Sequence, residues 1–123
     1  MTAIPYHRFA RPNQVATVHQ SIVVGADGRP YRAIDVNVHK GISIRVLPDR
    51  GLDISEAWFA GQPLHWAGWA EEGPPATRLD GQSWAGVFFG GVVTTCGLAS
   101  VGEPSEGYGL HGNVNHVPAS EVA

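Results

Sequence analysis

Hydrophobic and polar side chains alternate along much of residues 15–59, a period that is typical of β-strands with one buried face. The segment Tyr31–Val38 shows this most clearly, because Ile34, Val36 and Val38 alternate with small or polar residues. Turn residues separate the runs, and no segment has the length and period of an ordinary helix. This pattern predicts an all-β fold, with mainly antiparallel strands in a sandwich or barrel. The predicted strands are Val15–Gly25, Tyr31–Val38, Ile42–Leu47, Leu52–Phe59 and Ala85–Thr95.

The segments around these strands carry two further signals. Residues 1–14 show no period, and we interpret them as an irregular N-terminal arm ahead of a β domain at residues 15–123. Gly90 and Gly91 interrupt the most apolar run of the chain. Glycines inside a strand usually mark a bulge or a place where something approaches the backbone closely. The sequence leaves both interpretations open.

Composition narrows the class of protein. The 123 residues include 8 Lys+Arg and 11 Asp+Glu, and the net charge of -3 argues against binding to nucleic acid or to an anionic membrane. The single cysteine excludes an intrachain disulfide. The first residues lack the apolar stretch of a signal peptide, and no apolar run is long enough to span a bilayer. A soluble, cytoplasmic protein is the expectation.

Arg50 and Asp53 are the first candidate binding residues, in the string PDRGLDI. One interpretation is a turn whose charges face water. The other is a guanidinium that donates to ligand oxygens while a neighbouring carboxylate holds it in place. The residues themselves leave both interpretations open.

The other reactive side chains are weaker candidates. Cys96 follows an apolar run, where a free cysteine is usually a small core residue, and a nucleophilic cysteine would need a base such as His111. The spacing of His111 and His116 fits neither one strand face nor one helix face. We therefore expect no metal and no cofactor.

The tryptophans gather in one part of the chain. Core packing is their simplest explanation, but tryptophan faces also stack on the apolar faces of sugar rings. The four residues are Trp58, Trp66, Trp69 and Trp84.

Three segments together resemble one family. They are VLPDRGLDISEAWFAGQPLHWAG at Val46–Gly68, FFGGVVTTCGLASVG at Phe88–Gly102 and GYGLHGNVNHVPA at Gly107–Ala119. In this order they resemble the N-terminal half of uncharacterised bacterial proteins related to aldose 1-epimerases, in the galactose-mutarotase-like superfamily. The resemblance implies an antiparallel supersandwich with sugar bound in an open cleft on one sheet. It also implies interconversion of sugar anomers by a general acid and a general base.

The resemblance implies roles for particular residues. Arg50 and Asp53 match the family's Arg-Gly-Leu-Asp-Ile motif, so Arg50 would donate to sugar oxygens and Asp53 would orient it or accept from a hydroxyl. His111 matches the histidine of a His-Gly pair that hydrogen-bonds the sugar. We add Trp66 as a candidate for contact with the sugar ring. Many relatives have arginine where this chain has Asn113, so the chain departs from the family there.

The resemblance further implies an incomplete domain at residues 15–123. Complete relatives carry a second catalytic histidine and a glutamate base in a C-terminal half that has no counterpart here. We therefore expect the chain to bind a sugar or sugar derivative without catalysing mutarotation alone. We also expect self-association through exposed sheet edges.

Two other functions stay open at this point. A small cupin-like, metal-dependent β-barrel enzyme would suit the length and the histidine content, although the His-x-His metal motif of cupins is absent. A non-catalytic sugar-binding or assembly subunit is the other possibility. Elemental analysis would separate the cupin from the sugar-binding alternatives.

Overall fold

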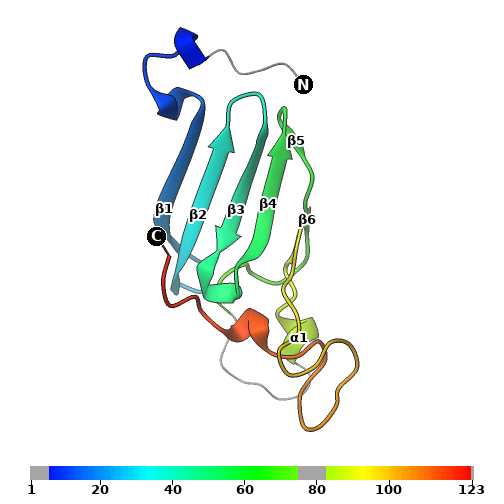
Figure 1. Ribbon diagram of the computed structural model, residues 1–123. Helices are drawn as coiled ribbons and strands as arrows, with labels where there is room; N and C mark the ends of the chain where they lie inside the picture. Colours follow the sequence, from blue (N-terminus) through cyan, green and yellow to red (C-terminus); the bar gives the residue numbers. More distant parts are fainter. Residues whose placement is uncertain (1–5, 75–82, 123) are drawn as a thin grey trace.

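The main element of the computed structural model is a five-stranded antiparallel sheet with the strand order β1-β2-β3-β4-β5. The structure describes residues 6–74 and 83–122. Each strand pairs with the next one along the chain, so the sheet is a meander with short connections (Figure 1). The strands are β1 (Ala16–Val24), β2 (Pro30–Val38), β3 (Ile42–Leu47), β4 (Asp53–Phe59) and β5 (Gln62–Pro63).

A second, two-stranded sheet completes the architecture. It pairs β6 (Trp66–Ala67) with β7 (Gly90–Gly91) in antiparallel orientation. Phe89, next to β7, packs against Tyr31 of β2 and Leu47 of β3, and these three side chains form the hydrophobic core. The prediction of an all-β, antiparallel sandwich is confirmed.

The first four predicted strands agree with the structure to within one residue at each end. The fifth prediction, a strand over Ala85–Thr95, is wrong. That segment contains the end of a short helix, α1 (Ser83–Gly86), and only the two-residue strand β7. Gly90 and Gly91 have φ angles of 96° and 85°, which lie far from the β region and prevent a continuous strand.

Of the two interpretations of these glycines, the structure shows a close approach, and the approaching atoms belong to other backbone. A Cβ atom on Gly90 would lie 2.6 Å from the carbonyl oxygen of Trp66, and one on Gly91 would lie 2.7 Å from that of Ile54. Both distances are too short for a side chain. Glycine is therefore required where β6 and β4 meet this segment.

The described part of the predicted N-terminal arm contains two short 3-10 helices, Tyr6–Arg8 and Pro12–Gln14, and no strand. Within the residues that the structure describes, no helix combines the length and the apolar character needed to cross a membrane.

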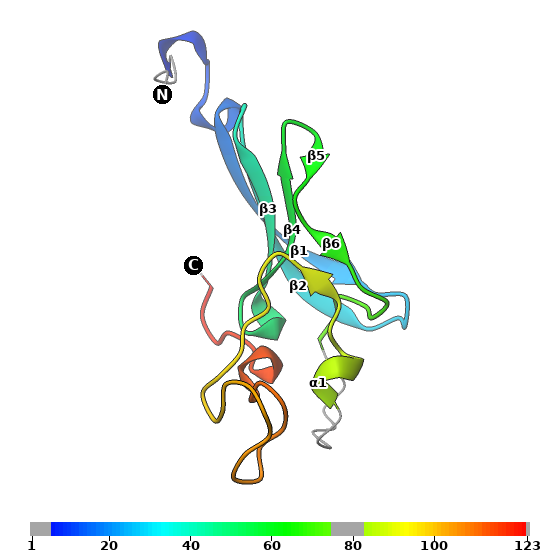
Figure 2. The same cartoon turned by 90° about the vertical axis from the view of Figure 1, so that its right-hand side faces the viewer.

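The two faces of the large sheet differ in chemistry. Asp35, Arg45 and Glu56 are direct neighbours across β2, β3 and β4, so they form a charged row on one face. The strand β6 lies on one side of the sheet and the C-terminal segment on the other (Figure 2). Because Glu56 lines a hollow together with residues of β6, the charged face is the one that the small sheet covers.

The opposite face is mainly apolar and exposed, and the C-terminal segment contacts it at Arg32, the register partner of Ile22. Its large side chains are between 45% and 67% exposed, and alternation and strand pairing place them on one side. These residues are Val18, Ile22, Val24, Ile42 and Phe59.

Candidate functional site

An open hollow of about 300 Å³ lies beside the small sheet. We call it the aromatic hollow. Its volume is at the lower end of the range for small-molecule sites, which suits a ligand the size of one sugar ring. The residues that give it chemical character are Trp66, Trp84, Phe88, Thr94 and His111.

Aromatic contacts organise this hollow. Trp84 stacks on Phe88 with ring centroids 4.8 Å apart, and the His111 ring meets Trp84 edge-on at 4.4 Å. Trp66 meets the other ring of this group, Phe88, edge-on at 5.3 Å, yet 56% of Trp66 remains exposed. Packed aromatic rings thus line one side of the hollow, and its accessible tryptophan is Trp66.

One polar group in the wall lacks a partner. Trp84 Nε1 is buried and makes no hydrogen bond to any part of the chain that the structure describes. An indole N–H can only donate, so a ligand oxygen or a water molecule would satisfy it.

The backbone around His111 fixes the place of its imidazole. His111 and Gly112 have φ angles of 59° and 73°, in the left-handed region. The His111 N–H donates to the Gly102 carbonyl at 2.7 Å, and the Gly97 N–H donates to the His111 carbonyl at 2.9 Å. A residue other than glycine persists in this region only where its surroundings hold it, so these hydrogen bonds fix the position of His111.

Arg50 and Asp53 lie in a different environment from Trp66 and His111. They are 1% and 0% exposed, and the Arg50 Nε lies 3.3 Å from an Asp53 carboxylate oxygen. The guanidinium also donates to the Gly73 and Val87 carbonyls, at 2.9 and 2.8 Å. The interpretation that the Arg50 charge faces water is therefore wrong, because the guanidinium ties two loop segments to the sheet.

Burial has electrostatic consequences for this pair. It lowers the pKa of the Arg50 guanidinium, while the Asp53 carboxylate opposes that change. The guanidinium carbon also sits 4.5 Å from the centre of the Phe89 ring, an additional favourable contact for a cation. A buried charge of this kind needs its partner, so the pair stabilises the packing around the core.

Asp53 connects the buried pair to the aromatic hollow. Its carboxylate accepts the Thr95 N–H at 2.5 Å, and the Thr95 hydroxyl lies 2.5 Å from the same oxygen. The neighbours of Thr95, Thr94 and Cys96, both line the hollow. Asp53 therefore positions Thr95, whose two neighbours form part of the wall of the hollow.

The structure thus divides the four predicted sugar-binding residues into two pairs. Trp66 and His111 line the aromatic hollow, whereas Arg50 and Asp53 form a buried pair that is not among its lining residues. Arg50 lines a separate hollow instead. Direct contact of Arg50 or Asp53 with a sugar stays a prediction. Sequence reasoning did not select Trp84, although the clustering of tryptophans was the signal that could have found it.

The sequence favoured Cys96 as a small core residue, but the structure shows that it is exposed. It lines the aromatic hollow together with His111, but within residues 6–74 and 83–122 no hydrogen bond joins the two. In the same residues, no group of three or more His, Cys, Asp and Glu side chains is placed to hold a metal ion.

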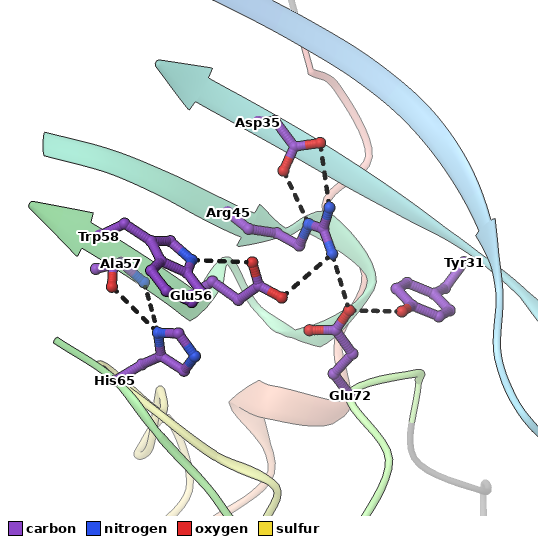
Figure 3. A network of polar contacts seen from close by, with 8 residues as sticks. All are labelled: Tyr31, Asp35, Arg45, Glu56, Ala57, Trp58, His65 and Glu72. Carbon is purple, nitrogen blue, oxygen red and sulfur yellow. Dashed lines mark hydrogen bonds and ion pairs between the residues drawn. The ribbon is translucent and has the colours of Figure 1, made fainter. Parts of the chain in front are cut away.

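A second polar cluster, around Arg45, was not identified from the sequence (Figure 3). The Arg45 Nε donates to Asp35 at 2.8 Å, and Nη1 lies 3.5 Å from Glu56 and 3.4 Å from Glu72. The Tyr31 hydroxyl donates to the same Glu72 carboxylate at 2.6 Å. The charged row of the sheet is therefore joined to the loop after β6.

These contacts shift two pKa values. The hydrogen bond to Asp35 is the main reason that the pKa of Arg45 is raised, and the charges of Glu56 and Glu72 add to it. Burial raises the pKa of the Tyr31 hydroxyl, and its bond to Glu72 raises it further. Both groups therefore keep their protons throughout the physiological range.

Comparison with models of known protein families identifies the family of this chain. Residues 28–123 match the model of a domain of unknown function, DUF4432. The chain belongs to the DUF4432 family. The family lies within the galactose mutarotase-like fold group, which agrees with the superfamily that the sequence resembles. No curated protein matches the chain, and no solved structure matches it.

The DUF4432 match covers the strands β2 to β7 and all the residues named above for the aromatic hollow. The hollow is therefore part of the family domain.

Proposed function

We propose that this DUF4432 chain binds a sugar or sugar derivative in the aromatic hollow. The observation that carries the proposal is that an exposed tryptophan and a histidine with a constrained backbone converge there. Trp66 offers an apolar surface to the C–H face of a sugar ring, while His111 and Thr94 can exchange hydrogen bonds with hydroxyl groups.

Two further observations support a sugar ligand. The unpartnered Trp84 N–H supplies one more donor for a hydroxyl oxygen. Membership of a family in the galactose mutarotase-like group favours a sugar over the cupin-like alternative. An aldose 1-epimerase-like relation would make His111 the candidate for one proton-transfer group.

Binding is tested by titrating the chain with D-galactose and D-glucose and following the tryptophan and histidine signals by NMR. Trp66→Ala should weaken binding about tenfold or more, which corresponds to about 1.4 kcal/mol. His111→Asn should do the same, because asparagine tolerates the left-handed backbone while removing the imidazole.

Trp58→Ala is the matched control, since Trp58 is 39% exposed and is not among the residues of the aromatic hollow. Its affinity should equal that of the unchanged chain. Equal affinity in all three variants would refute the proposed site.

A further inference from the structure

A second hollow, of about 260 Å³, adjoins the aromatic hollow, and Trp66 lines both. We call it the acidic hollow. It lies between the charged row of the large sheet and the loop after β6, next to the cluster drawn in Figure 3. The residues that define it are Ser55, Glu56, Trp69, Glu71 and Glu72.

The acidic hollow carries an excess of negative charge. Three carboxylates line it, and neither lysine nor arginine is among its described lining residues. Arg45 contacts Glu56 and Glu72 but also shares its charge with Asp35, so three carboxylates contact one guanidinium. Glu71 is not in contact with Arg45 and also lines a neighbouring hollow with Arg29 and Arg50. His65, the other titratable group in the wall, has its Nδ1 directed to the backbone of Ala57.

A buried hydroxyl gives independent evidence for a ligand. Ser55 is 3% exposed, and its Oγ has no hydrogen-bond partner among the described residues. The strand pairing is irregular at Arg45/Val46, opposite Ser55, and such a bulge re-aims side chains. Ser55 and its neighbour Glu56 consequently line the same hollow. A buried polar group without a partner calls for one, and a ligand in this hollow would supply it.

The rest of the wall suits an organic cation. Trp66 and Trp69 are 56% and 81% exposed, and an indole face attracts an ammonium group. The described carboxylates do not form a cluster able to hold a metal ion. An ammonium group held by charge, hydrogen bonds and indole faces fits this combination better than a bare metal ion.

We propose that the acidic hollow is a subsite for a protonated amine, so that the ligand of the two hollows is an amino sugar. The proposal rests on the proposed function, because it assumes that the sugar ring occupies the aromatic hollow on the other side of Trp66. The amine enters between Glu56, Glu71 and Glu72. Uronic acids and sugar phosphates are disfavoured, because their charge has the same sign as the wall.

The test compares three ligands by isothermal titration at pH 7: D-glucosamine, N-acetyl-D-glucosamine and D-glucose. At this pH the amine of D-glucosamine is largely protonated. D-glucosamine should bind about tenfold more tightly than either neutral sugar at low salt. The preference for D-glucosamine over the neutral sugars should decrease in about 1 M sodium chloride, where the screening length falls to about 3 Å.

Two variants localise the amine. Glu71→Gln and Glu72→Gln should each reduce the preference to about threefold or less, by removing one attractive charge. Glu71 is exposed, so Glu71→Gln retains the fold even if loss of the Tyr31 contact makes Glu72→Gln unstable. Glu103→Gln, at an exposed position that does not line the hollow, is the control and should keep the full preference.

The outcomes separate this inference from the proposed function. Equal affinity for the three sugars would overturn the amine subsite and leave sugar binding in place. Binding of none of them would overturn both proposals. A preference for D-glucosamine that survives in both carboxylate variants would also overturn the subsite, because the amine would then bind elsewhere.

Discussion

Gly112 sits at the tightest point of the loop that carries His111. A Cβ atom there would collide with the Gly97 carbonyl and would lie 2.5 Å from the Ser100 carbonyl oxygen. Its φ of 73° adds a conformational reason for glycine. The His-Gly pair that the family resemblance singled out therefore has a physical requirement at its second position.

Gly112→Ala should destabilise the chain by about 2–4 kcal/mol, because backbone strain and a backbone collision add together. Urea denaturation followed by tryptophan fluorescence measures the change. Gly107→Ala is the matched control, since Gly107 has a φ of 84° but nothing within 4 Å of an added Cβ atom. A loss equal to that of Gly107→Ala would show that the collision is unimportant.

Asp53→Asn should destabilise the chain by about 3–5 kcal/mol, because it leaves the buried Arg50 guanidinium without its counter-charge. The free energy of unfolding from urea titration checks this. Asp27→Asn removes an ion pair with Arg29 that is about half exposed, with side chains 41% and 53% exposed, and should destabilise the chain far less than Asp53→Asn. Similar small losses in both variants would contradict a stabilising role for the buried pair.

At the scale of elements, the last 3-10 helix, Val114–His116, packs against the turn that contains Arg50. Gly51 marks the contact, since its N–H donates to the Val117 carbonyl at 3.1 Å. Burial lowers the pKa of His116, and the positive charge of Arg50 lowers it further, while Asp53 opposes both. The helix therefore packs with a neutral histidine.

This helix should make stability depend on pH. The unfolded chain binds a proton at His116 near pH 6.5 and the folded chain only at lower pH, so stability is complete above about pH 6.5 and falls as the pH drops below it. Urea denaturation at a series of pH values between about 5 and 8 measures the slope. His116→Gln should remove this part of the slope, whereas His19→Gln, at an exposed position on β1, should keep it. An unchanged slope in His116→Gln would contradict the assignment.

At the scale of the whole molecule, the open apolar face of the large sheet is the dominant surface feature. The nine-residue strand β1 spans about 30 Å, and four strands side by side span about 19 Å. Two such faces packed together would cover roughly 1,100 Å², which is close to the lower limit for a specific interface. Self-association was predicted through the sheet edges, and the apolar face is a second surface through which it could occur.

We expect the chain to self-associate in a concentration-dependent way through this face. The double variant Ile22→Thr with Val24→Thr should weaken association about tenfold or more, because it removes two exposed apolar side chains while threonine keeps the preference for strands. Sedimentation velocity over a range of concentrations measures the effect. Ser21→Thr, also on β1 but pointing to the other face, should leave it unchanged. A chain that stays monomeric at every concentration would contradict the prediction.

The local pattern of residues was sufficient for the first four strands, because alternation and turn residues act within a few positions of one another. The sequence also indicated either a bulge or a close approach at Gly90 and Gly91, since glycine has few other reasons to interrupt an apolar run. Tryptophan clustering and family resemblance singled out Trp66 and His111, which line one hollow in the structure, and their contact with a sugar stays a prediction.

The remaining features depend on contacts between distant segments. Arg50 became a buried residue because the Gly73 and Val87 carbonyls, which lie far along the chain, close over its guanidinium. The charged row needs the strand register, and Glu72 joins it only because the loop after β6 folds back. No local period encodes such distances. Packing decides which charges are buried and which line a hollow, because burial is a property of all the segments that meet at one place.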